Sequence, residues 1–151
     1  MSELYLRPAA EEDGEILYEW RNDPETRQNS FHSEVFPFEA HMQWLRRVLS
    51  SSSERLRIMM LGAVPIGQVR LSVDGTTANI SYGIAPAYRR QGYGARILQL
   101  IENELDETNN TIQILAAQVK KENIASQRIF EKLRYETQQR DMVICYQKKI
   151  Y

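Results

Sequence analysis

Residues 85–95 read Ala85-Pro86-Ala87-Tyr88-Arg89-Arg90-Gln91-Gly92-Tyr93-Gly94-Ala95, and this stretch decides the fold. Before it, apolar and polar residues alternate from Ala78 to Ile84, which predicts a strand with one buried face. After it, apolar residues recur at helical spacing from Ile97 to Leu105. A turn with two glycines therefore joins a strand to a helix N-terminus, where unpaired backbone N–H groups favour an anion.

The chemistry of this turn predicts a site for a diphosphate. Gly92 and Gly94 carry no Cβ, so we expect the backbone to approach phosphate oxygens closely, while Arg89 and Arg90 add positive charge. No Gly-Lys-Ser/Thr ends the turn, so it is not a Walker A loop. It is not a G-x-G-x-x-G loop either, because Ile97 stands where that pattern requires its third glycine.

A second motif lies at residues 119–135, where an asparagine opens a predicted helix that ends in Lys132-Leu133-Arg134-Tyr135. The first motif is similar to the Arg/Gln-x-x-Gly-x-Gly/Ala signature of the GCN5-related N-acetyltransferases (GNAT). The second resembles the helix of that family that ends in a Lys-Leu-Gly-Phe-like turn. With the opening pattern from Leu4 to Glu19, the resemblance spans essentially the whole chain.

The resemblance implies an α+β fold: a single domain over residues 1–151 with a central mixed, twisted sheet flanked by helices. It also implies that strands 77–84 and 112–119 splay apart and admit the pantetheine arm of acetyl-CoA, the acetyl donor. Asn123 would face the pantetheine, and the backbone N–H of Ile84 would stabilise the oxyanion. The implied coenzyme-binding residues are Ile84, Arg89, Arg90, Gln91, Gly92, Tyr93, Gly94, Ala95 and Asn123.

The remaining pattern predicts elements in the order expected of this family. Asn22-Asp23-Pro24 is predicted to end the first helix, and the residues after it to form a polar loop. The predicted elements are a strand at Leu4–Arg7, helices at Glu11–Arg21 and Phe38–Leu49, strands at Arg55–Leu61 and Ile66–Val73, and tail strands near Glu136 and at Met142–Lys149.

Composition narrows the class of protein. A chain of 151 residues with 42% hydrophobic residues fits one domain with a real core. The net charge of −1 gives no electrostatic case for nucleic acid, and no apolar run approaches the length of a membrane span. We expect a cytoplasmic protein without nucleic-acid or membrane partners, and the candidate assembly is a homodimer. His32 and His41 lack the spacing of metal ligands, so no metal is expected.

The reaction that the resemblance implies is attack of a primary amine on the thioester, and here the chain departs from the family. Phe130 stands where many relatives carry a tyrosine acid, and no glutamate lies near Asn79, where many carry one. Ser126 is a candidate donor to the departing thiolate, and the candidates for a base or water holder are Glu34, His41 and Tyr82. Each also has a plain structural interpretation. Ser126 would support the first helical turn, Glu34 and His41 would lie on the surface, and Tyr82 would lie on the apolar side of its strand.

The stretch from Trp20 to Phe31 resembles the acceptor region of acetyltransferases from bacterial amino-sugar pathways, whose acceptor is a nucleotide-linked amino sugar. Arg27 is then expected to bind a phosphate, and Asn29 or Ser30 a sugar hydroxyl, although a capped polar loop explains the same residues. A similar branch acetylates the N-terminal amine of ribosomal proteins. Because both usual proton-transfer groups are missing, a non-catalytic coenzyme A-binding sensor is the alternative of another class.

Overall fold

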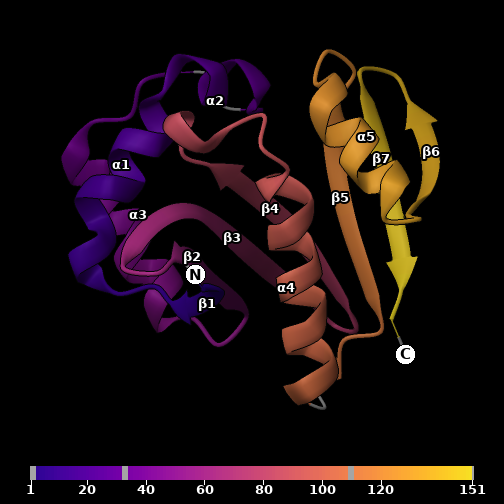
Figure 1. The fold of residues 1–151 in the computed structure, drawn as a ribbon, viewed down its shortest axis with the longest axis horizontal. Coiled ribbons are helices and arrows are strands. Elements are labelled where there is room, and N and C mark those ends of the chain that lie inside the picture. Colours follow the sequence, from indigo (N-terminus) through magenta and orange to yellow (C-terminus); the bar gives the residue numbers. More distant parts are fainter. Residues whose placement is uncertain (1–2, 32–33, 109–110, 151) are drawn as a thin grey trace.

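The computed structural model describes residues 3–31, 34–108 and 111–150, whose strands form one seven-stranded sheet of order β1-β2-β3-β4-β5-β7-β6 (Figure 1). Neighbouring strands are antiparallel except β4 and β5, which run parallel. This confirms the predicted mixed sheet. The strands are β1 (Leu4–Pro8), β2 (Glu54–Leu61), β3 (Val64–Asp74), β4 (Thr77–Ile84), β5 (Ile114–Lys120), β6 (Glu136–Arg140) and β7 (Val143–Lys149).

Helices cover both faces of the sheet, with α1 and α3 packed on one face and α4 and α5 on the other. None of the helices in the described ranges has both the length and the apolarity needed to cross a membrane. The helices are α1 (Gly14–Asn22), α2 (Pro24–Asn29), α3 (Phe38–Ser50), α4 (Tyr93–Thr108) and α5 (Ile124–Lys132), with 3₁₀ turns η1 (Glu11–Asp13) and η2 (Pro86–Tyr88).

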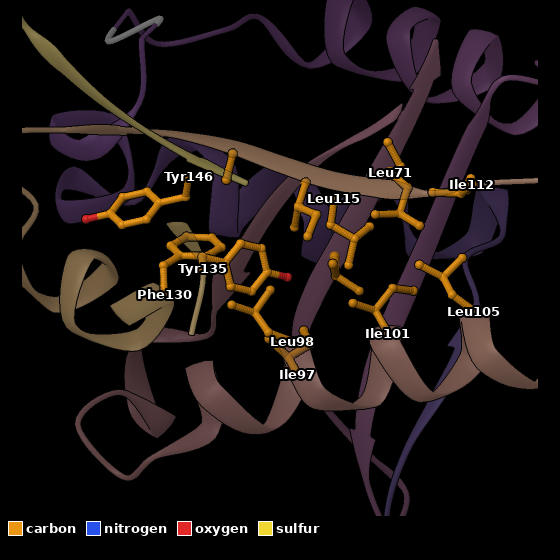
Figure 2. Packing of buried hydrophobic residues seen from close by; sticks show 14 of the residues in the cluster. Leu71, Ile97, Leu98, Ile101, Leu105, Ile112, Leu115, Phe130, Tyr135 and Tyr146 are labelled. Atoms are coloured by element: carbon orange, nitrogen blue, oxygen red, sulfur yellow. The ribbon is translucent and has the colours of Figure 1, made fainter. Parts of the chain in front are cut away.

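The alternation of β2 separates the two cores. Ile58 belongs to the smaller cluster under α1 and α3, whereas the next residue, Met59, belongs to the larger cluster under α4 and α5. Figure 2 shows the larger core, where Leu98 and Ile101 of α4 lie beside Leu115 of β5. The two helical layers are therefore held independently, one on each side of the sheet.

The parallel pair β4 and β5 is joined over three register positions only, Thr77–Asn79 against Ile114–Ala116. Beyond them β4 stays paired with β3 as far as Ile84, and β5 stays paired with β7 as far as Lys120. The two central strands thus part after Asn79, as the resemblance implied. The end of β4 leads directly into residues 85–95.

The main difference from the sequence prediction is α2, which occupies residues expected to form a loop. Asp23 caps it by accepting a hydrogen bond from the Thr26 N–H at 3.1 Å, and Pro24 takes the first helical position. The Asp-Pro pair that ends α1 therefore also begins a second helix. The predicted first helix is also divided, because residues 11–13 form η1 and α1 starts at Gly14.

Candidate active site

The predicted phosphate turn lies between the end of β4 and the start of α4. The N–H of Arg96 makes the first bond of α4, to the Gly92 carbonyl at 3.4 Å, so the N–H groups of Tyr93, Gly94 and Ala95 precede the helical ladder. Such N–H groups at the positive end of the helix dipole are suited to a pyrophosphate. Next to them, the Gln91 side chain donates to the Ala87 carbonyl at 3.3 Å and steadies the turn.

The two glycines of the turn have different roles. Gly92 has φ +85° and open space around its missing Cβ, so its backbone conformation needs glycine and leaves room for a ligand. Gly94 is buried, and a Cβ there would lie 2.6 Å from Cδ1 of Ile129 and 3.5 Å from the Tyr82 ring. The missing side chain of Gly94 therefore also lets α4 approach α5, and the approach of its backbone to a phosphate stays a prediction.

The two arginines of the turn are not free charges, contrary to the sequence expectation. The Arg89 guanidinium lies 2.8 Å from an Asp23 carboxylate oxygen and 3.0 Å from one of Glu25, and Arg90 lies 3.2 Å from Glu25. Asp23 is the N-cap residue of α2 and Glu25 lies in its first turn, and their charges balance those of the arginines. No local signal predicts this, because Glu25 and Arg90 are 65 residues apart in the chain.

Ser126 and Tyr82 meet where β4 and β5 have parted, with their hydroxyl oxygens 2.6 Å apart. Ser126 lies in the first turn of α5, and its N–H donates to the side-chain oxygen of the capping residue Asn123 at 3.2 Å. Burial raises the pKa of Tyr82, outweighing the opposite effect of the Ser126 hydrogen bond. A phenol that keeps its proton at neutral pH is a donor, so the prediction of Tyr82 as a base does not fit.

His41 is completely buried between α1 and α3, so neither the predicted base nor a surface position fits it. Burial lowers its pKa, outweighing the hydrogen bond to the Gly14 carbonyl, and the charge of Arg21 lowers it further. The neutral ring donates from Nε2 to Gly14 at 3.0 Å and accepts at Nδ1 from Arg21 at 3.5 Å. Glu34, by contrast, is exposed, and its role as a base stays a prediction.

Phe130, at the position of the usual tyrosine acid, is a core residue here. It is 1% exposed, stacks on Tyr146 with ring centroids 5.1 Å apart and meets the edge of Tyr135 at 5.0 Å. Figure 2 shows these three side chains together in the larger core. A hydroxyl is therefore supplied to this region by Tyr82 and Ser126 instead.

The predicted acceptor residues lie together at the end of α2. Arg27 is half-buried and donates from Nε to the Asn22 carbonyl at 3.1 Å, so one of its donors is used within the fold. Asn29 is the last residue of α2, and Ser30 caps it through its N–H to the Arg27 carbonyl at 3.2 Å. Their approach to an acceptor stays a prediction.

An arginine that the sequence analysis did not single out lies beside this helix. Arg21, near the end of α1, lies 3.7 Å above the ring of Phe36 and 4.8 Å from the ring of Trp44. Arg70 of β3 lies 5.7 Å from the same Trp44 ring, but it is paired with Glu54 at 3.2 Å. Within the described ranges no carboxylate lies at ion-pair distance from Arg21, whose pKa is lowered by burial and then by Arg70.

The sheet face that carries Arg70 is polar beyond the cover of α3. Asn79 and Ser81 of β4 are exposed on it, and β4 faces the core under α4 with its other side. An open groove of about 440 Å³ continues over β5, β7 and β6 on this face. Amide side chains line it at four positions, Asn79, Gln118, Gln138 and Gln147.

Comparison with known proteins agrees with this architecture. A family model for the acetyltransferase (GNAT) domain matches residues 3–136, while no curated protein matches significantly. A domain from Methanocaldococcus jannaschii is similar in structure, with a TM-score of 0.86, 20% identity and 99% of both chains covered.

Two further structures were solved with coenzyme A. The RimL ribosomal L7/L12 alpha-N-protein acetyltransferase has a TM-score of 0.85 and 15% identity, covering 97% of this chain and 94% of that one. Spermidine N-acetyltransferase from Vibrio cholerae, also holding spermine, has a TM-score of 0.85 and 18% identity, with 97% and 95% covered. At these identities the likeness shows a shared fold.

Proposed function

Because the chain belongs to the acetyltransferase (GNAT) domain family, we propose that it transfers the acetyl group of acetyl-CoA to the primary amine of a nucleotide-linked amino sugar. Acetyl-CoA is the co-substrate of this family. The choice of acceptor is the proposal. It is supported by the resemblance of residues 20–31 to enzymes with that acceptor.

The observation that carries the choice is Arg21, a half-buried cation without a carboxylate partner in the described part of the chain. A guanidinium held against two aromatic rings is preorganised to bind a phosphate. The amide-lined groove on the same sheet face supplies donors and acceptors for sugar hydroxyls. A polyamine, which is itself cationic, is disfavoured beside the charge of Arg21, which is unpaired among the residues that the structure describes.

In the proposed reaction the neutral amine attacks the acetyl carbonyl carbon, a C–N bond forms, and the C–S bond breaks. Positioning of the amine beside the thioester supplies most of the acceleration. Residues 92–95 hold the pyrophosphate through backbone N–H groups, which fixes the thioester where β4 and β5 part. The proton lost by the amine passes to water.

Ser126 and Tyr82 assist the leaving group. The Ser126 hydroxyl donates a hydrogen bond to the departing thiolate, while the Tyr82 hydroxyl donates to Ser126 Oγ. Because the pKa of Tyr82 is raised, its proton is present throughout the neutral range. The pair thereby replaces the single tyrosine that Phe130 cannot provide.

Release of free thiol from acetyl-CoA over a panel of amines tests the proposal. The panel contains a uridine-diphosphate amino sugar, spermidine and a short peptide with a free N-terminus. We expect turnover with the amino-sugar nucleotide. Arg21→Gln should raise the KM for this nucleotide about tenfold, which corresponds to the loss of one charged hydrogen bond. Arg47→Gln changes an exposed position on α3 and is the control. It should leave the KM for the nucleotide and the KM for acetyl-CoA unchanged.

Two outcomes contradict the proposal. Acetylation of the peptide N-terminus without activity on the amino-sugar nucleotide favours a protein acetyltransferase. Coenzyme-dependent stabilisation of the protein without turnover of any amine indicates a coenzyme A sensor.

A further inference from the structure

Helix α2 is attached on both sides of the point where the central strands part. At its N-terminus Arg89, from the predicted coenzyme turn after β4, contacts three side chains, those of Asp23, Glu25 and Thr26. At its C-terminus Lys120, the last residue of β5, donates to the Gln28 carbonyl at 3.2 Å. The helix therefore lies between the ends of β4 and β5.

The contact at the N-terminus is built into the helix cap. One oxygen of Asp23 accepts the Thr26 N–H at 3.1 Å and also lies 2.8 Å from Nη2 of Arg89. The same Nη2 donates to the Thr26 hydroxyl at 2.9 Å, and Nη1 lies 3.0 Å from Glu25. Both terminal nitrogens of Arg89 are thus directed at α2.

The neighbouring arginine is placed differently. The side chain of Arg90 is 81% exposed, whereas those of Arg89 and Asp23 are 17% and 16% exposed. Arg90 has one partner, Glu25, whose own side chain is 43% exposed. An exposed ion pair is easily exchanged, while a shielded guanidinium with three partners is not.

We propose that Arg89 is a positioning residue for the acceptor, which fixes α2 against the coenzyme turn, and that Arg90 is the arginine that turns to the coenzyme pyrophosphate. Through Arg89 the residues expected to meet the acceptor, Arg27 and Asn29, take a defined place relative to the thioester. This consequence rests on the proposed function. The attachment of α2 through Arg89 does not depend on the proposed function, because it is seen in the contacts themselves.

Paired substitutions separate the two roles. Arg89→Gln should raise the acceptor KM at least about fivefold and leave the dissociation constant of coenzyme A, measured by calorimetry, within about twofold. Arg90→Gln should raise the dissociation constant of coenzyme A at least about fivefold and leave the acceptor KM within about twofold. Arg57→Gln is the control, because it removes another partly buried arginine–glutamate pair, at 3.1 Å, away from α2.

Asp23→Asn tests the same contact from the other side. Asparagine still caps a helix, so this variant removes the charge and keeps the cap. It should reproduce the Arg89→Gln effect, and the double variant should be no worse than either single one.

Hydrogen exchange supplies a readout that needs no acceptor. In Arg89→Gln and in Asp23→Asn, the amides of residues 27–30 should exchange at least about fivefold faster, while those of α4 and α5 keep their rates. If the amino-sugar nucleotide proves inert, this measurement still decides the proposal. A tenfold loss of coenzyme A affinity in Arg89→Gln with unchanged exchange in α2 would show that Arg89 is a pyrophosphate ligand instead.

Discussion

At the scale of single residues, backbone conformation separates Gly92 from Gly94. The first has a positive φ and faces open space, while the second is closed in by Ile129 and Tyr82. Substitutions at the two glycines therefore report on different properties. A change at Gly92 is expected to report on coenzyme binding, and a change at Gly94 on the contact between α4 and α5.

Gly92→Asp should weaken coenzyme A binding at least about tenfold, because it places a negative side chain beside the N–H groups proposed to face the pyrophosphate. Calorimetry measures the affinity. Gly75→Asp is the matched control, since Gly75 also has a positive φ, +64°, and open space around it. Both variants should lose about 1 kcal/mol of stability from backbone strain, but only the first should lose affinity. Equal affinities in the two variants would place the pyrophosphate elsewhere.

Ser126→Ala should lower kcat about tenfold at saturating substrates, because it removes the donor to the thiolate. Tyr82→Phe should lower it by a similar factor, and the double variant should fall no further, since the two hydroxyls act as a pair at 2.6 Å. Steady-state kinetics with the best amine of the panel measures kcat for both single variants and for the double variant. An unchanged kcat in Ser126→Ala removes this residue from the mechanism.

At the scale of elements, the end of α5 is strained where the family has glycine. Arg134 has φ +67°, the left-handed conformation of a helix end, and the N–H of Tyr135 bonds back to the Phe130 carbonyl at 3.0 Å. The turn is therefore kept although the glycine is lost. An arginine adopts it at a cost of about 1 kcal/mol.

Arg134→Gly should raise the free energy of unfolding by about 0.5–1 kcal/mol, since glycine adopts this conformation without the steric penalty. Urea denaturation measures the change. Arg128→Gly, on an exposed turn within α5, should instead lower stability by about 1 kcal/mol. If Arg134→Gly also destabilises, the arginine side chain makes a compensating contact.

At the scale of the whole molecule, a neutral buried histidine makes stability depend on pH. The pKa of His41 is lowered from 6.5 in the fold, so folding excludes a proton that the unfolded chain binds. Stability from this group is complete above about pH 6.5 and is lost as the pH falls from there toward the folded pKa. The pKa of Asp13 is held below 3.8 by its hydrogen bonds from Arg7, so its contribution is lost only at lower pH.

The free energy of unfolding should therefore fall as the pH drops below about 6.5, with a slope of at most about 1.4 kcal/mol per pH unit. Urea denaturation at several pH values measures the slope. His41→Gln retains a donor for the Gly14 carbonyl and cannot take up a proton, so its profile should be flatter in this range. An equal slope in both proteins would assign the effect to another group.

The sequence by itself determined the elements that local patterns encode. Alternation marked β4, helical spacing marked α4, and the glycine turn between them marked the family and the predicted coenzyme site. These signals are short-range, because strand and helix periods, turns and helix ends depend on neighbours within a few residues. The capping signal of α2 was also present at Asp23-Pro24, although the same residues more plainly indicated a turn.

Tertiary structure alone decided which side chains meet. The pairing of Arg89 with Asp23, the contact of Tyr82 with Ser126, and the burial of His41 beneath α1 join residues far apart in the chain. Local patterns carry no record of such partners, since charge pairing and desolvation arise only when packing brings elements together. For that reason the sequence marked the turn predicted to bind the coenzyme, while the fold determined which acids pair with its arginines.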